Sequence, residues 1–267
     1  MLKSKKMKTN IQNSSLLFLI LISFYINSNN YGDPGEIFAI KVTDQNKSNN
    51  LILPIKNSLY KLIPLPFEKQ NSIIEVDGYK ININHKDFGE SRIIIKNNSM
   101  VNLSKKDSDR TFKEYQLIQK KLGKFSTSLK PNLEFMLPVV GIISSRYGKK
   151  RFINDEPRSP HLALDIAAPE GTKIVSPSEG KIILIGNFFY AGNYVIIDHG
   201  YGLMSSYSHL SKIDVKVDQI INKGQKIGEV GSTGRVTGPH LHWTVYLNKI
   251  RINPESLTKE NYLESLL

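Results

Sequence analysis

The pattern of hydrophobic and polar residues divides the chain into two β-rich halves joined by a helical segment. In the first half, short apolar runs alternate with clusters of Asn, Asp, Gly and Pro, which is typical of strands separated by turns. The predicted strands are residues 36–42, 50–55, 72–76, 79–83 and 92–95. We therefore expect a small N-terminal β-domain over residues 31–104.

The segment of residues 105–137 is predicted to hold a connecting helix and a linker. Thr111 and Glu114 have the spacing of a capping box, in which the Thr hydroxyl accepts from a backbone N–H and the Glu side chain reaches back. A helix that begins there would end at Gly123. Three apolar residues recur on one face of it: Tyr115, Ile118 and Leu122. We expect this face to pack on a domain and residues 126–131 to form the linker.

From residue 138 to residue 267 the pattern changes to β-rich runs punctuated by glycine. The predicted strands are residues 181–185, 194–198, 204–208, 226–230 and 243–247, and residues 254–257 are ambiguous. Short strands at this spacing favour a compact antiparallel sheet structure. The predicted fold class is therefore mainly β, with a C-terminal antiparallel β-sandwich or barrel-sandwich-like domain.

The first 30 residues are typical of an export segment. Four lysines precede an apolar run over residues 16–26 that only Ser23 interrupts. A basic start followed by a short apolar run indicates a secretory signal peptide, and the run is shorter than the ~20 residues of a usual membrane span. We predict export to the periplasm or cell envelope. An uncleaved anchor, associated with the inner membrane through residues 16–26, is the alternative.

Composition and charge narrow the chemistry. The 267 residues include no cysteine, which excludes disulfides, thiolate zinc sites and iron–sulfur clusters. The formal net charge is +12, or +8 without the four N-terminal lysines, and favours an anionic surface such as a cell envelope. Because the basic residues are scattered and not interleaved with aromatics, no nucleic-acid partner is predicted.

Five of the six histidines lie in the second half of the chain. His161 and Asp165 are four residues apart, and His240 and His242 are two apart, so that in a strand both imidazoles point to one face. Three protein ligands completed by water are typical of catalytic zinc, and His161, Asp165 and one histidine of the 240/242 pair can supply them. His209 and the remaining histidine would then serve in proton transfer near neutral pH.

The other two histidines have simpler interpretations. His199 stands beside a turn glycine, Gly200, and is predicted to be structural. His85 lies in a polar turn of the first half and is predicted to be a solvated surface residue.

A series of short motifs over residues 138–253 resembles the lysostaphin/LytM-type zinc metallopeptidases, which cut peptide bonds in bacterial peptidoglycan. The motifs occur in the order of that family: Ser145-Arg146-Tyr147-Gly148, His161-x-x-x-Asp165, Ala168-Pro169-x-Gly171-Thr172, Asp198-His199-Gly200, Tyr207-Ser208-His209-Leu210, Gly231-Ser232-Thr233-Gly234 and Gly238-Pro239-His240-Leu241-His242-Trp243. The upstream β-domain and helix are similar to the N-terminal extension of exported members from Gram-negative bacteria.

The resemblance implies one zinc ion per chain with three protein ligands and a catalytic histidine pair. The implied ligands are His161, Asp165 and His242, and the implied pair is His209 and His240. The implied activity is hydrolysis of peptidoglycan peptide crosslinks, most simply the D-Ala–diaminopimelate bond, in cell-wall remodelling, with stem peptides as the partner. Tyr207, two residues before His209 in a predicted strand, is a candidate for transition-state support, and core packing is the equal alternative.

Two other functions fit parts of the pattern. A non-enzymatic peptidoglycan-binding or amidase-activating protein is the main rival, because degenerate relatives act by contact alone, but the intact ligand and acid–base positions argue against it. A lipoyl or biotinyl carrier would explain the glycine rhythm of residues 176–185 and 223–228. That carrier needs a lysine at a tight hairpin within a characteristic motif, which is not seen.

Overall fold

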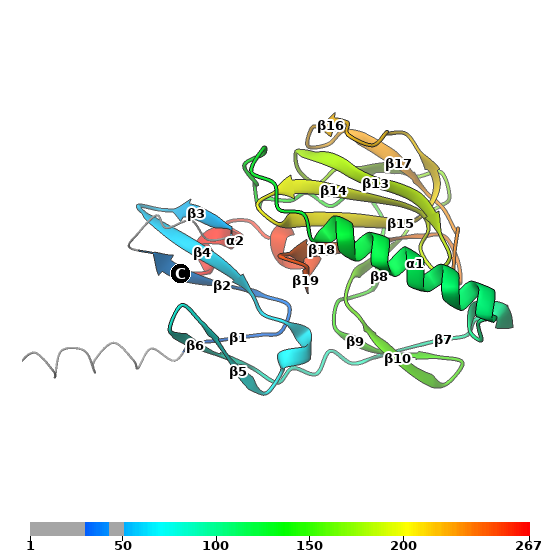
Figure 1. Ribbon diagram of the computed structural model, residues 1–267, viewed down its shortest axis with the longest axis horizontal. Coiled ribbons are helices and arrows are strands. Elements are labelled where there is room, and N and C mark those ends of the chain that lie inside the picture. Colours follow the sequence, from blue (N-terminus) through cyan, green and yellow to red (C-terminus); the bar gives the residue numbers. More distant parts are fainter. Residues whose placement is uncertain (1–29, 43–50) are drawn as a thin grey trace, which may run out of the picture.

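The computed structural model describes residues 30–42 and 51–267 of the chain (Figure 1). Residues 1–29 of the predicted export segment, which include its apolar run at residues 16–26, lie outside the described residues. Within the described ranges, no helix combines the length and the apolar character that crossing a membrane requires.

Six strands of the first part form two three-stranded sheets. One sheet has the order β1-β6-β5 and the other the order β2-β4-β3. The strands are β1 (Tyr31–Gly32), β2 (Ile37–Val42), β3 (Ile52–Ile55), β4 (Ser58–Pro64), β5 (Ser72–Val76) and β6 (Tyr79–Ile83), with a 3-10 turn η2 (Phe67–Lys69) between β4 and β5. The two sheets share a small apolar cluster that includes Ile40, Ile63 and Ile81. The predicted strands at residues 72–76 and 79–83 are confirmed as β5 and β6.

The last predicted strand of the first half joins the second half of the molecule instead. It is found as β7 (Glu90–Ile93), two residues earlier than predicted, and runs parallel to β9 (Lys149–Ile153). β9 also pairs in antiparallel fashion with β10 (Glu156–His161). The result is a sheet of order β10-β9-β7 that combines residues from both halves of the chain and ends at His161.

The second part is built on one large sheet of ten strands. Its main path has the order β16-β13-β14-β15-β18-β11-β8, with β12, β17 and β19 attached beside it. The strands are β8 (Ile142–Ser145), β11 (Leu164–Ala167), β12 (Lys173–Val175), β13 (Gly180–Phe188), β14 (Gly192–Gly200), β15 (Leu203–Ile213), β16 (Ile220–Ile221), β17 (Lys226–Val230), β18 (His240–Leu247) and β19 (Ile250–Ile252). All its pairings are antiparallel, so the predicted mainly β fold with an antiparallel C-terminal part is confirmed.

The connecting helix starts earlier than the sequence pattern predicts. A short 3-10 turn η3 (Asn98–Met100) precedes α1 (Lys105–Leu122), and Gly123 ends the helix as predicted. The N-cap is Ser104, whose Oγ accepts from the backbone N–H of Asp107 at 3.1 Å. The predicted capping box at Thr111 is therefore wrong, because an equivalent cap seven residues upstream lets the helix form two turns earlier.

One side chain assigned to that capping box, Glu114, instead fastens α1 to the large sheet, while the Thr111 hydroxyl donates to the Ser108 carbonyl within the helix. Glu114 accepts a hydrogen bond from the backbone N–H of Phe189 at 2.8 Å, just beyond β13. Leu122 is buried beside Leu184, and Ile118 packs on the same cluster, whereas Tyr115 is largely exposed. Figure 1 shows α1 lying along β13, β14 and β15.

The main core connects the large sheet with the sheet β2-β4-β3. Its members include Leu51 and Leu62 from the first part together with Trp243 and Leu257 from the second. The ambiguous residues 254–257 belong to a 3-10 helix η4 (Pro254–Thr258), which is followed by α2 (Tyr262–Ser265). The carboxylate of Glu36 on the first part accepts hydrogen bonds from both, Ser256 Oγ at 2.8 Å and Tyr262 OH at 3.1 Å.

An aromatic cluster fixes the segment between β8 and β9 against the first part. The Tyr147 ring contacts Phe67 and Phe88 edge-on, at centroid distances of 6.1 and 5.9 Å. Its hydroxyl donates to the carbonyl of Arg251 at 3.1 Å. Gly148 has a φ of +90° and lies so close to Phe88 that a Cβ would be 2.3 Å from the ring. The packing of Tyr147 and the close approach of Gly148 to Phe88 explain the adjacent Tyr and Gly of the motif Ser145-Arg146-Tyr147-Gly148.

We predict that Tyr147→Ala lowers the free energy of unfolding by about 3–5 kcal/mol, since it opens a cavity in a cluster where Tyr147 is only 2% exposed. Urea denaturation of the full chain measures the change. Phe112→Ala, at a position that is 61% exposed on α1, is the matched control and should change stability by less than about 0.5 kcal/mol. Equal effects of the two substitutions would contradict the packing role.

Candidate metal centre

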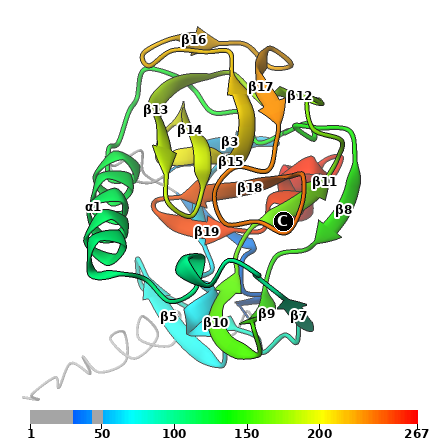
Figure 2. The ribbon, with the colours of Figure 1, turned by 90° about the vertical axis from the view of Figure 1, so that its right-hand side faces the viewer.

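The pairing of β11 with β18 brings three of the predicted site residues to one face. In this antiparallel pair Asp165 lies directly opposite His242, and Ala167 lies opposite His240. Directly opposite residues project to the same side of a sheet, so Asp165 and both histidines point together. Figure 2 shows these two strands between the upper strands of the sheet and the β9–β10 hairpin.

His161 approaches the same point from the end of β10. Its Nδ1 is 3.0 Å from the carbonyl oxygen of Arg146, which can only accept, so Nδ1 carries the proton. In the neutral ring Nε2 then holds the lone pair, and it lies 2.9 Å from Asp165 Oδ1. This carbonyl contact is the kind that orients an imidazole toward a metal.

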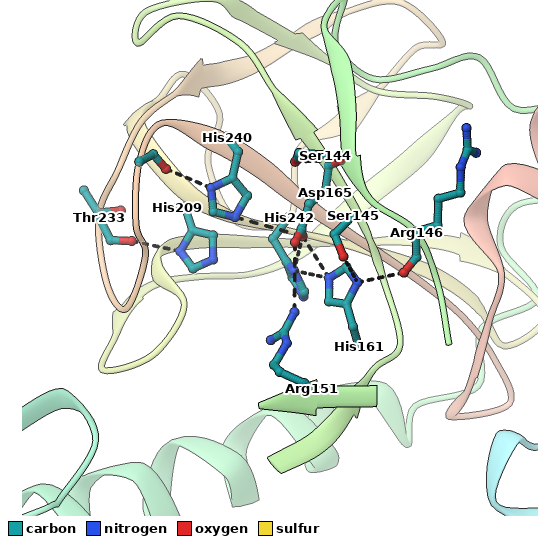
Figure 3. A network of polar contacts seen from close by, with 11 residues as sticks. Ser144, Ser145, Arg146, Arg151, His161, Asp165, His209, Thr233, His240 and His242 are labelled. Atoms are coloured by element: carbon teal, nitrogen blue, oxygen red, sulfur yellow. Dashed lines mark hydrogen bonds and ion pairs between the residues drawn. The ribbon is translucent and has the colours of Figure 1, made fainter. Parts of the chain in front are cut away.

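The three polar atoms converge closely enough to share one ion. Asp165 Oδ1 is 2.6 Å from His242 Nδ1, and His161 Nε2 is 3.3 Å from the same nitrogen (Figure 3). Two nitrogens and one carboxylate oxygen form a donor set that zinc accepts, and donors around four-coordinate zinc lie roughly 3.3 Å apart. Among the described residues, His161, Asp165 and His242 are the group that could hold a metal ion.

Burial sets the charge of these groups in favour of metal binding. Burial lowers the pKa of His242 to about 4, so its ring is neutral at neutral pH. Burial alone would raise the pKa of Asp165, but its close polar contacts with His242 and His161 hold this pKa well below the usual range, so the carboxyl group is ionised. The site therefore presents one carboxylate and neutral imidazole nitrogen to a cation.

His209 reaches the site through an irregularity in β15. Along β14, Asn193 pairs with Leu210 and Val195 pairs with Tyr207, so Ser208 and His209 share a single position on the partner strand. His209 has a φ of +69°, which is uncommon for a residue other than glycine. This bulge redirects the His209 side chain, as bulges beside functional sites commonly do.

His209 and His240 face each other beside the metal group. Their ring centroids are 4.9 Å apart, and His240 Nε2 is 4.0 Å from Asp165 Oδ1. Each Nδ1 is 2.9 Å from a backbone carbonyl, that of Thr233 for His209 and that of Gly238 for His240, so each Nδ1 donates and each Nε2 remains for other partners. Burial lowers the pKa of His209 to about 3, which keeps this ring neutral.

The five residues lie within a stretch that matches a known protein family. The model of peptidase family M23 matches residues 159–254. This part of the chain is an M23 peptidase domain.

Curated relatives also resemble part of the chain. Peptidoglycan DD-endopeptidase ShyA of Vibrio cholerae is 43% identical over 120 residues, which are 45% of this chain and 27% of ShyA. DD-carboxypeptidase/endopeptidase Mpg of Neisseria meningitidis is 40% identical over 97 residues, which are 36% of this chain and 22% of Mpg. The chain thus matches less than a third of the length of either relative.

A solved structure extends the likeness to the first part of the chain. A Pseudomonas aeruginosa protein described as a candidate M23 peptidase is 29% identical, with a TM-score of 0.65. The match covers 89% of this chain and 98% of that one. The arrangement of small sheets before the M23 domain is therefore shared with that structure.

Two adjoining cavities flank the M23 site, with volumes of about 480 and about 450 Å³. Six residues line both cavities: Arg151, Tyr190, Ala191, Ser208, Arg235 and His242. The sequence pattern did not indicate Arg151, Tyr190 or Arg235, since they come from three separate segments and belong to no metal-ligand spacing. Of the three segments, the sequence motifs indicated only the one before Arg235, through Gly231-Ser232-Thr233-Gly234.

Tyr207 lies away from the M23 site. It is fully buried, and its hydroxyl is 2.8 Å from Ser205 Oγ, which is in turn 2.8 Å from His199 Nε2. His199 Nδ1 donates to the carbonyl of Glu179 at 2.7 Å. Because the bulge at Ser208 and His209 breaks the strand alternation, Tyr207 does not share a face with His209. This position corresponds to core packing, the alternative to transition-state support for Tyr207.

We predict that His199 makes the protein less stable as the pH falls below 6.5. Burial lowers the pKa of native His199 to about 4, whereas the unfolded side chain takes up a proton near pH 6.5. Between these values the unfolded state binds more protons, so from pH 7.5 to pH 5 stability falls by about 2 kcal/mol through this residue. Urea denaturation at both pH values measures the loss.

The matched substitutions are His199→Gln and His85→Gln, the second on an exposed loop. His199→Gln should be less stable at pH 7.5 but lose about 2 kcal/mol less than the wild type on going to pH 5. His85→Gln should retain the wild-type difference. An unchanged pH dependence in His199→Gln would contradict the prediction.

Proposed function

We propose that this chain is a zinc-dependent endopeptidase that hydrolyses peptide crosslinks of bacterial peptidoglycan. The observation that carries the proposal is the convergence of His161, Asp165 and His242 beside the histidine pair His209 and His240, inside an M23 domain. ShyA is named as a peptidoglycan DD-endopeptidase, which supports a D-Ala–diaminopimelate crosslink as the substrate. Cell-wall remodelling is the corresponding role.

The proposed zinc ligands are His161 Nε2, Asp165 Oδ1 and His242 Nδ1, the three atoms that converge. Bound zinc supplies a Lewis acid, which polarises the scissile carbonyl and lowers the pKa of water toward ~7. The protein orients the ligands in advance, because the Arg146 carbonyl fixes the His161 ring and the β11–β18 pairing fixes Asp165 against His242. Little rearrangement is then needed when the ion binds.

The proposed catalytic pair handles the protons of hydrolysis. His209 and His240 each commit Nδ1 to a backbone carbonyl, so each turns Nε2 toward other partners. One ring accepts the proton of the attacking water at its Nε2 lone pair and passes it to the leaving nitrogen, and the other stabilises the oxyanion on the carbonyl in the form that carries a proton on both ring nitrogens. The short separation of the two rings allows both to act on one peptide bond.

The proposed location is outside the cytoplasm, in the periplasm or cell envelope. The basic, then apolar, N-terminal sequence supports export, with cleavage or anchoring through residues 16–26 as the two alternatives. The remaining charge of +8 favours retention at an anionic wall. Wall-acting relatives such as ShyA support the same location.

We predict that His161→Ala and His209→Ala separate metal binding from catalysis. His161→Ala should lose both zinc and hydrolysis, since it removes a ligand. His209→Ala should keep about one zinc per chain and lose activity by about 10²–10⁴-fold, since it removes a proton-transfer group. Elemental analysis and a peptide-cleavage assay measure the two effects, with His85→Ala as the control. Near-normal activity of His209→Ala would overturn its assignment.

We predict that the purified protein removes D-Ala–diaminopimelate crosslinks from isolated sacculi. Mass identification of the released and remaining muropeptides should show crosslinked dimers converted to monomers. A chelator should abolish the conversion, and added zinc should restore it. Binding to sacculi without loss of any crosslink would instead favour the non-enzymatic wall-binding alternative.

A further inference from the structure

Three arginines gather beside the M23 site, and we call them the arginine cluster: Arg151, Arg158 and Arg235. Arg151 on β9 lies directly opposite Arg158 on β10, and Arg235 belongs to the segment between β17 and β18. All three line the same cavity as His161 and His242. Figure 3 shows the Arg151 side chain extending from its strand toward Asp165.

The cluster places like charges close together at a cost in stability. Directly opposite residues of equal charge destabilise a strand pair, and Arg151 and Arg158 occupy such positions. Burial lowers the pKa of Arg235, and the charges of Arg151 and Arg158 lower it further. The Arg235 guanidinium lies 4.1 Å from the centroid of the Tyr190 ring, which holds it in the cavity wall. A compensating anion would relieve this repulsion.

The cluster has almost no carboxylate partner of its own. Arg151 approaches Asp165 Oδ2 only to 4.0 Å, and Arg151 Nε is buried without a hydrogen-bond partner. Asp165 is already engaged by two histidines. Over residues 30–42 and 51–267, no ion pair involves Arg158 or Arg235. Arg235 donates a hydrogen bond to the carbonyl of Met100 at 3.5 Å, which is no charged partner.

Each of the other arginines of the chain has a local partner. Each of them pairs with a carboxylate or hydrogen-bonds a tyrosine: Arg92 with Glu90 and Asp155, Arg110 with Glu114, Arg146 with Glu255, and Arg251 with Tyr246. Arg251 also lines the cavity of the cluster, but it has Tyr246 as a partner, so the shortage of partners is particular to Arg151, Arg158 and Arg235. The guanidinium groups of the cluster are left with donors for an anion from outside the chain.

We infer that the arginine cluster is a subsite for a substrate carboxylate adjacent to the scissile peptide bond. The inference rests on the proposed function. Diaminopimelate is a diamino diacid, so the carbon that carries the crosslinked nitrogen also carries a carboxylate. When the scissile carbonyl lies at His161, Asp165 and His242, this carboxylate lies beside them, at the arginine cluster. Planar guanidinium groups bind carboxylates in bidentate fashion. The subsite orients the bond and selects acidic over amidated crosslinks.

The test compares two synthetic crosslinked peptides that differ only in this group. One has the free carboxylate next to the scissile nitrogen and the other has a primary amide there. The variants are Arg158→Gln, Arg235→Gln and the conservative Arg151→Lys. The matched control is Lys150→Gln, which removes one charge from an exposed position on the same strand as Arg151. Zinc content is measured for each protein, because Arg151 lies near Asp165.

The wild type should cleave the acid with a kcat/KM about 10- to 100-fold above that of the amide, the range expected for charge-assisted hydrogen bonds. Arg158→Gln and Arg235→Gln should raise KM for the acid with little change in kcat, and remove most of the preference. Arg151→Lys should keep part of it, and Lys150→Gln all of it. Equal cleavage of both peptides by the wild type overturns the subsite and leaves the proposed function intact.

A binding measurement separates the subsite from catalysis. Calorimetric titration of the wild-type protein uses the product peptide that ends in the free amine and carboxylate, and its amide counterpart. The acid should bind about 10-fold or more tightly than the amide, with the difference lost in Arg158→Gln and Arg235→Gln. Equal binding overturns the subsite. Failure to cleave either peptide, with the acid still preferred in binding, would count against the proposed function and for the subsite.

Discussion

The register between β11 and β18 is the constraint on which the rest of the site depends. It sets Asp165 opposite His242 and Ala167 opposite His240, so that one carboxylate and two imidazoles share a face. A shift of one residue would turn His242 away and bring Leu241, a core residue, into the site. The burial of Leu241 and Trp243 in the main core fixes this register, so the apolar core and the polar site stabilise the same arrangement.

The parts around this strand pair are arranged to complete the site. The sheet β10-β9-β7 ends at His161, and the Arg146 carbonyl, next to the buried Tyr147, orients its ring. The bulge in β15 turns His209 toward His240, at the expense of a strained φ. Strands thus carry the proposed ligands, and of the five proposed site residues only His209 has a positive φ.

The first part of the chain contributes to the structure around the site. β7 extends the sheet that carries Arg151 and His161, and Glu36 ties β2 to the C-terminal helices. The shared core of the β2-β4-β3 sheet and the large sheet makes the first part a packing partner of the M23 domain. The domain boundaries expected from the sequence pattern, at residues 104 and 138, stay a prediction. The pairing of β7 with β9 joins strands from either side of them.

The sequence by itself determined the mainly β class, the positions of about half of the strands in the described residues and the five candidate residues, because strand periodicity and His/Asp spacing are local signals. It failed in two ways. The cap of α1 at Ser104 is a local signal that was passed over in favour of Thr111, whereas β7 pairs with β9, a partner far along the chain that no local pattern indicates. Strand alternation predicted that Tyr207 and His209 share a face. The bulge in β15, which is visible only in its pairing with β14, puts them on different faces. Tertiary structure alone brought Arg151, Arg158 and Arg235 beside the histidines, since burial and repulsion among charges from separate strands leave no pattern in sequence.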